Sequence, residues 1–263
     1  MGNHTSKLCF TFFLAALLWV QGSAPVSRAS ETSPPFLVGE KLRFQVRWAF
    51  IPAGEFFLEV LPMEIIEGKR SYHFLLSART YPVVDVFYKV RDRIEAFTDE
   101  GMTHTLLYKK NRKGKSKRDV LVTFDYQKLE ARYSNFGEKR DPVPIAPGSF
   151  DPLSVFYAFR LVDLKENMEL EVPVSDGKKF IIGKARVLRR ERIKVPGGTY
   201  DTFLVEPNLK QIGGVFKKSK NAKLKVWVTT DRRHIPVRIE SKVRVGYFVA
   251  NLLSMENTAP LSP

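Results

Sequence analysis

The chain has 263 residues, one cysteine and a formal net charge of +15 at pH 7, from 43 Lys and Arg against 28 Asp and Glu. This length is enough for one large β domain or two small ones. The cysteine, Cys9, lies close to the first residue, so the rest of the chain has no thiol for catalysis, disulfides or sulfur-ligated metals. A protein this basic is attracted to anionic surfaces.

Residues 1–24 have the three parts of an export signal. Lys7 supplies the charged start, 8–20 the apolar run, and Gly22-Ser23-Ala24 a small-residue cleavage site, with a second candidate site at 27–29. The apolar run is about thirteen residues, short of the roughly twenty that span a bilayer, which favours cleavage over a retained anchor. An exported protein is expected to meet phospholipid head groups, lipopolysaccharide, acidic glycans or acidic proteins rather than nucleic acid.

Residues 25–38 are rich in proline and serine and are expected to form a flexible leader. From Glu40 apolar and charged residues alternate, which is typical of half-buried strands. The segment Ile51-Pro52-Ala53-Gly54 is expected to turn the chain between the first two strands. Further strands are predicted at 72–80, 83–97, 102–110, 120–126 and 129–134.

One helix is predicted over 148–164, where Asp151 suits the N-cap and Pro152 the first helical position. Apolar residues at helical spacing cover most of its surface. Arg160 lies within them and needs a carboxylate or an anionic head group, since a buried unpaired guanidinium is costly. We expect the helix to be either a plug that fills the concave face of a sheet or one wall of a ligand cavity.

After the helix, strands are predicted at 168–174, 179–194, 199–206, 224–229, 235–245 and 246–254. Short strands at regular spacing indicate a mainly β protein with a curved antiparallel sheet that forms an open or incomplete barrel around one internal helix. Two packed β subdomains are the alternative. The expected organisation is a single β-rich domain over 39–254 and a loose tail over 255–263.

Several motifs occur in the order typical of one known family. They are Gly39-Glu40-Lys41-Leu42, Ile51-Pro52-Ala53-Gly54, Asp151-Pro152-Leu153-Ser154, Val195-Pro196-Gly197-Gly198-Thr199-Tyr200-Asp201, Val226-Trp227-Val228-Thr229-Thr230-Asp231 and Ile235-Pro236-Val237. From about residue 39 to 253 the chain resembles the bacterial exported family called domain of unknown function 3108. The resemblance implies a mostly β fold in the Gram-negative cell envelope, hence the periplasm, and it transfers no catalytic residue.

Motifs for a catalytic or cofactor site are not recognisable in the sequence. His73, His104 and His234 lack the short spacings of a metal site, and neither a nucleophile elbow nor a phosphate-binding glycine loop is present. We therefore expect no metal, no cofactor and no catalytic residue. Paired carboxylates of the glycosidase kind leave no reliable sequence pattern and remain the enzymatic alternative.

Two groups of residues are candidate binding sites. One is a basic hairpin tip that is either an anion site or a charged edge that keeps the protein soluble: Lys109, Lys110, Arg112, Lys113, Lys115, Lys117 and Arg118. The other comprises residues on and near the helix that are expected to contact an apolar ligand, together with one tryptophan: Phe156, Tyr157, Arg160, Leu161 and Trp48.

These observations favour a non-enzymatic periplasmic protein that binds or carries an amphipathic, anionic envelope molecule, either a lipid or a glycolipid. Peripheral contact with the membrane is part of this hypothesis. The alternatives are an envelope enzyme that cleaves glycan with paired carboxylates and a scaffold whose basic loops bind an acidic partner.

Overall fold

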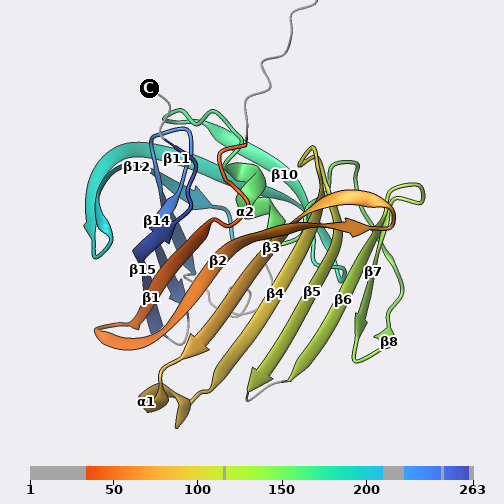
Figure 1. Cartoon of the computed structure of the whole chain (residues 1–263), viewed down its shortest axis with the longest axis horizontal. Helices are drawn as coiled ribbons and strands as arrows, with labels where there is room; N and C mark the ends of the chain where they lie inside the picture. Colours follow the sequence, from red (N-terminus) through yellow and green to blue (C-terminus); the bar gives the residue numbers. More distant parts are fainter. Residues whose placement is uncertain (1–33, 115–116, 210–221, 244–245, 261–263) are drawn as a thin grey trace, which may run out of the picture. The chain divides into compact units, whose positions relative to one another are not determined.

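The strands of this protein form one antiparallel sheet in the computed structural model, which describes residues 34–114, 117–209, 222–243 and 246–260 (Figure 1). Nine strands precede the central helix in the chain. They are β1 (Lys41–Trp48), β2 (Ile51–Ile66), β3 (Lys69–Thr80), β4 (Val90–Asp99), β5 (Thr105–Gly114), β6 (Arg118–Asp125), β7 (Glu130–Asn135), β8 (Glu138–Lys139) and β9 (Val143–Pro144).

Six strands follow the helix and continue the same sheet. They are β10 (Glu169–Ser175), β11 (Phe180–Val195), β12 (Gly198–Pro207), β13 (Lys223–Thr229), β14 (Pro236–Val243) and β15 (Gly246–Glu256). The last strand pairs with the first, from Lys41 opposite Glu256 to Trp48 opposite Phe248, which joins the two halves.

The spatial order runs from β10 to β15, then β1, and on to β8, with β9 paired to β7, so the described sheet stays open. This confirms the predicted open antiparallel sheet with an internal helix, and no division into two subdomains is seen. The segment before the helix is bonded to both halves. Phe150 forms backbone hydrogen bonds with β10, and the Ser149 carbonyl accepts one from Thr105 at the start of β5.

The helix α2 spans Ser154–Phe159 and is shorter than predicted. The Asp151 carboxylate does cap the first turn, because Oδ1 accepts hydrogen bonds from the amides of Leu153 and Ser154 at 2.7 and 3.0 Å. Its other oxygen accepts one from the Thr105 hydroxyl at 2.7 Å, which fixes the helix start to β5. Beyond Phe159 only bends and turns follow, so Leu161 is not helical.

Two local predictions are wrong. The segment Ile51–Gly54 is not a turn but the start of β2. The turn consists of Ala49 and Phe50, and Ala49 has a φ of 51°. Gly54 is needed for another reason, since a Cβ there would lie 2.3 Å from the Arg79 carbonyl oxygen of β3. The expected strand over 83–97 begins only at Val90, because a short helix α1 (Pro82–Asp85) occupies its first residues.

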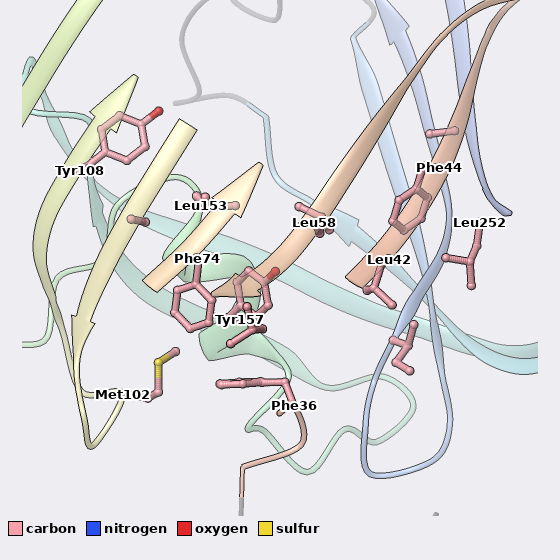
Figure 2. Close-up of a cluster of buried hydrophobic side chains, with 14 of the residues drawn as sticks. Phe36, Leu42, Phe44, Leu58, Phe74, Met102, Tyr108, Leu153, Tyr157 and Leu252 are labelled. Carbon is pink, nitrogen blue, oxygen red and sulfur yellow. The ribbon is translucent and has the colours of Figure 1, made fainter. Parts of the chain in front are cut away.

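The main core packs α2 against β1–β7 and extends along the sheet to residues of β11–β15, among them Leu204, Val237 and Leu252 (Figure 2). The Tyr157 ring stacks on Phe74 with 3.9 Å between centroids, and Phe36 meets both rings edge-on at 5.5 Å. The sequence places Phe36 in a flexible leader, which is wrong for this residue. Its ring is buried because it packs edge-on against Phe74 and Tyr157 and is thereby removed from water. The tail is likewise packed as far as it is described, since Ala259 is buried.

The first prediction concerns the core side of α2. Tyr157 is 1% exposed, so Tyr157→Ala is expected to lower the free energy of unfolding by about 3 to 5 kcal/mol, as for other buried aromatic side chains. Leu161 is 43% exposed, and Leu161→Ala should change it by less than about 0.5 kcal/mol. Urea unfolding followed by circular dichroism measures both values, and equal effects of the two substitutions would contradict the packing described.

Candidate functional site

A cavity of about 380 Å³ lies between α2 and the strands β10–β13. We call it the α2 cavity. Its volume is within the range of roughly 300 to 1,000 Å³ found for small-molecule pockets. Its wall consists of Pro152, Val155, Phe156, Phe159, Arg160, Leu170, Val172, Val174, Asp176, Lys179, Ile181, Gly183, Lys184, Ala185, Val205, Pro207, Asn208, Leu224, Val226, Val228 and His234.

The strands supply an apolar wall because their residues alternate between two faces. In β11 the residues Ile181, Gly183 and Ala185 line the cavity, whereas Ile182 and Arg186 between and beyond them are exposed. Ala185 has a small side chain, so it leaves space that a larger residue would fill, whereas a Cβ at Gly183 would lie 3.3 Å from the Val172 carbonyl oxygen and from Val174 Cγ2 of β10. The cavity floor is therefore set by small residues at alternate positions.

The helix separates the core from the cavity. Tyr157 and Leu153 point into the main core, whereas Val155 and Phe159 line the cavity. Phe156 lines the cavity and also packs against both hydrophobic clusters. The helix is thus a plug on one side and a cavity wall on the other, which explains why apolar residues cover most of its surface.

Polar side chains in the wall come mainly from the β10–β11 hairpin. The Lys184 ammonium group is 2.5 Å from Glu171 Oε1, and its pKa is raised by the hydrogen bond to this carboxylate. Asp176 Oδ1 accepts hydrogen bonds from the amides of Lys178 and Lys179, so this carboxylate holds the hairpin turn. Lys184 and Glu171 are both mostly exposed and alternate with the cavity-lining residues of β11 and β10, so this ion pair lies on the outer face of the hairpin.

Arg160 is 2% exposed and is paired with Glu40, which is 1% exposed. Its Nη1 and Nη2 donate to the two Glu40 carboxylate oxygens at 2.5 and 3.0 Å, a bidentate pair. Nη2 also donates to the Pro35 carbonyl and Nε to the Arg233 carbonyl, at 3.1 and 2.8 Å. Of the two partners expected for this guanidinium, the protein supplies the carboxylate.

His234 lies beside this pair in the cavity wall. Its Nδ1 is 3.2 Å from the Arg160 carbonyl oxygen, which can only accept, so Nδ1 carries the proton. Burial lowers the pKa of His234 below its ordinary value of 6.5, and the hydrogen bond to Arg160 offsets only part of that effect. The imidazole is therefore neutral at pH 7.

Of the five residues predicted to contact a ligand, Phe156 and Arg160 line the α2 cavity and three do not. Tyr157 lies on the core side of α2, with its hydroxyl 3.4 Å from the Glu59 carbonyl oxygen. Leu161 follows the end of the helix and is exposed. Trp48 stacks on Phe248 at the end of β1, with 6.3 Å between the ring centroids.

The predicted basic tip is divided between the two faces of the sheet. Along β5, Lys110 and Arg112 share the face of buried Tyr108, and both Arg112 Nε and Nη2 lie 2.9 Å from Asp92 Oδ2. Lys109 and Lys113 lie on the other face, and the Lys109 ammonium group is 5.1 Å from the centroid of the Phe97 ring. Burial lowers the pKa of Lys110.

The remaining residues of the tip follow β5 in the chain. Lys117 and Arg118 are exposed, and Lys115 is outside the described residues. Lys109, Lys110 and Lys113 contribute to a groove over β4–β7, together with Arg91, Asp92, Arg93, Glu95, Asn111, Asp119 and others. Acidic and basic side chains alternate there, so the tip does not form one purely cationic surface.

Sequence reasoning missed the strand side of the cavity. Val172, Val174, Ala185 and Val205 were recognised only as parts of strands. Two signals could have indicated them: the all-round apolar surface of the helix, which needs a second apolar partner, and the small residues Gly183 and Ala185 at alternate positions of a long strand.

The described residues contain no cluster of three or more His, Cys, Asp or Glu that could hold a metal ion. Within the same residues, the helices are too short or too polar to cross a bilayer. Asp176 is the single carboxylate among the described residues of the cavity wall.

The second prediction tests the buried ion pair. Glu40→Ala leaves the Arg160 guanidinium buried without a counter-charge and is expected to lower the free energy of unfolding by about 3 to 5 kcal/mol. The double variant Glu40→Leu with Arg160→Met should regain much of this loss, because no unpaired charge remains. Guanidinium unfolding of the parent and both variants measures the difference.

An exposed ion pair is the control for this experiment. Glu169 and Arg186 lie 3.0 Å apart with both side chains mostly exposed, so Glu169→Ala should cost about 1 kcal/mol or less. A loss from Glu40→Ala no larger than that from Glu169→Ala would show that the buried pair does not hold the fold.

The third prediction concerns pH. Because folding lowers the pKa of His234, the unfolded chain binds more protons as the pH falls through 6.5, and stability is lost in that direction. Asn tolerates the φ of 41° at this position, so His234→Asn should show a smaller fall in melting temperature between pH 7.5 and 5.5 than the parent. Burial also lowers the pKa of His104, so His104→Gln is measured in parallel. If the melting temperatures of the parent and of His234→Asn fall equally between pH 7.5 and 5.5, His234 is not the cause of the pH dependence.

Three solved structures align with this chain, and the first of them supports the fold. A β-barrel-like protein of domain of unknown function DUF1849 from Brucella abortus aligns with a TM-score of 0.52 at 8% identity, over 85% of this chain and 99% of that chain. A predicted lipoprotein from Parabacteroides distasonis aligns with a TM-score of 0.32 at 13% identity, over 84% and 97%. A predicted exported protein with a YmcC-like fold from Bacteroides fragilis has a TM-score of 0.31 at 11% identity, over 84% and 97%.

At 8% identity the Brucella abortus protein shows likeness of fold alone. The search of curated proteins found no match. The model of the family described as protein of unknown function, DUF3108, matches residues 43–252, which is most of the chain. The match includes α2, most of β1 and the first part of β15. The chain therefore belongs to the DUF3108 family.

Proposed function

We propose that this protein is a non-enzymatic carrier of the bacterial periplasm that binds an amphipathic, anionic envelope molecule, a lipid or a glycolipid, in the α2 cavity. The observation that carries the proposal is the cavity itself, a space of about 380 Å³ with an almost wholly apolar wall beside a helix whose other side is fully packed. Burial of an apolar chain there is favoured by about 25 cal/mol per Å² of surface removed from water.

The polar side chains of the wall agree with an anionic head group. Lys179, at the β10–β11 turn, is a cationic residue of the wall, and the charges of Lys184 and Arg160 are paired with Glu171 and Glu40. A ligand is therefore expected to lie with its apolar part against Val155, Phe159 and the strands and with its charge towards the β10–β11 turn. The predicted export signal at residues 1–24 supports a location in the periplasm, where such molecules occur.

The enzymatic alternative has less support at this site. Glycoside hydrolysis by the usual mechanism needs two carboxyl groups that face each other across the bond to be cleaved. In the described part of the cavity wall Asp176 is the single carboxylate, and its Oδ1 accepts two backbone amides. A scaffold that binds an acidic protein through the basic tip is also less favoured, because the tip residues divide between two faces of the sheet.

The fourth prediction fills the cavity. Ala185→Phe adds a ring to the wall and is expected to reduce uptake of a fluorescent fatty acid at least tenfold, because the ring occupies the space of the acyl chain. Ile182→Phe, on the exposed face of the same strand, is the matched control and should bind like the parent. Fluorescence titration measures uptake, and native mass spectrometry identifies any lipid that co-purifies.

Either of two results would overturn the carrier proposal. One is a parent protein that takes up no acyl probe and carries no lipid. The other is equal uptake by Ala185→Phe and Ile182→Phe while both variants keep the parent's melting temperature.

A further inference from the structure

One end of the sheet exposes an unusual number of large apolar side chains. The β1–β2 turn, helix α1 and the start of β15 meet there, because Tyr81 donates a backbone hydrogen bond to the Ala53 carbonyl and Ala49 donates one to the Tyr247 carbonyl. Figure 1 shows α1 and the β1–β2 turn at this end. We call it the apolar rim, and its exposed apolar residues are Trp48, Phe50, Ile51, Val83, Val86, Phe87, Tyr88 and Tyr247.

The exposure of these side chains is extreme. Val83, Phe50, Phe87 and Val86 are 73 to 80% exposed, more than any other large apolar side chain of the described residues. Single exposed apolar residues are common in soluble proteins, but a group of eight at one end of a sheet marks an interaction surface. In water this arrangement is costly, so a partner that removes the side chains from water is expected.

The rim is held in this conformation by hydrogen bonds. Asp85 in α1 accepts a hydrogen bond from the Thr80 hydroxyl, and its Oδ2 lies 2.5 Å from Arg91 Nη2. The Thr80 hydroxyl in turn accepts the Val90 amide at 3.0 Å. These bonds close the loop between β3 and β4, so that Val83, Val86 and Phe87 stay exposed rather than fold back onto the sheet.

Basic side chains surround the rim. Pairing of Val90 with Gly114 places the end of β5 beside the loop that follows α1, and the start of β15 lies beside the end of β1. The exposed basic residues of the described segments at this end are Arg47, Lys89, Lys113, Lys117, Arg118 and Lys242. The acidic residues Asp85, Asp119 and Glu240 lie among these segments; Asp85 is paired with Arg91, and Glu240 is hydrogen-bonded to Tyr247.

We propose that the apolar rim docks the protein on the surface of an anionic phospholipid bilayer, with α1 and the β1–β2 turn at the boundary between head groups and acyl chains. Aromatic and aliphatic side chains flanked by Lys and Arg are the combination that binds at this boundary. A second copy of the chain is disfavoured as the occupant, because a two-fold contact would bring two basic rims together. This docking surface is separate from the α2 cavity.

The test measures binding of the protein to vesicles of phosphatidylglycerol and phosphatidylethanolamine by flotation. The variant Val86→Ser with Phe87→Ser is expected to bind at least tenfold more weakly than the parent. Ile65→Ser is the matched control, since Ile65 is 67% exposed on β2 but pairs with Arg70 near the β2–β3 turn, away from the rim. All three proteins should melt at the same temperature because the changed side chains are exposed.

Two further measurements identify the contact. Trp19 lies in the predicted export signal, so the experiment uses the chain from residue 25 on. In that chain Trp48 is at the rim and Trp227 is buried, so acyl-brominated anionic vesicles should quench Trp48, and Trp48→Phe should abolish that quenching. Vesicle binding by the parent should weaken as salt rises from 0.05 to 0.5 M, because salt screens the attraction to the lipid head groups.

Three outcomes would overturn the docking proposal: equal vesicle binding by the rim variant and the parent, equal binding of zwitterionic and anionic vesicles, or self-association that the rim variant loses while no vesicle binds. Failure of this proposal and failure of the carrier proposal are distinguishable. The rim variant should still take up the fatty acid probe, and Ala185→Phe should still bind vesicles.

Discussion

The buried pair between Glu40 and Arg160 is the contact on which the arrangement of this protein depends. It joins residues 120 positions apart, one directly before β1 and the other directly after α2. The same guanidinium donates to carbonyl oxygens of Pro35 and Arg233, so it links the start of the sheet, the helix and the turn between β13 and β14. A buried pair adds little net stability over an apolar substitute, but breaking it is costly, so its effect is to exclude other positions of the helix.

A helix fixed in this way can have a filled side and an open side. Tyr157, Phe74 and Phe36 fill the space towards β1–β7, and the energy of that packing does not depend on the space on the far side. Towards β10–β13 the strand residues are small or short, so the apolar surface of α2 is only partly covered. A protein without a function at this place would gain stability from a larger residue at Ala185, where the side chain faces the cavity.

Much of the fold was predictable from the sequence because alternation along a strand is a local signal. The strand pairs β5–β6 and β13–β14 were recognised from alternating residues, and the cap at Asp151 from one dipeptide. Contacts between distant segments were not predictable, since nothing local in Glu40 marks it as the partner of Arg160. Residues 83–89 predict a strand because Val, Phe and Tyr favour strands. The hydrogen bonds that stabilise the helix α1 and its loop instead join Asp85 to Thr80 and Arg91, one from each side of the loop.

The net charge of the chain shows where its surface is positive only after the ion pairs between basic and acidic side chains are taken into account. Within the described sheet, many basic residues are paired with an acidic residue on the neighbouring strand. Arg112 is paired with Asp92, Arg43 and Arg79 share Glu55, and Lys184 is paired with Glu171. Alternation places every second residue of a run on the opposite face, so a run in the sequence is not a patch on the surface. Positive charge remains in excess where acidic partners are few, at the end of the sheet that also exposes Phe50, Val86 and Phe87. The docking proposal rests on the coincidence of excess positive charge and exposed apolar surface at one end, because solubility alone would be served by the charges without the aromatic side chains.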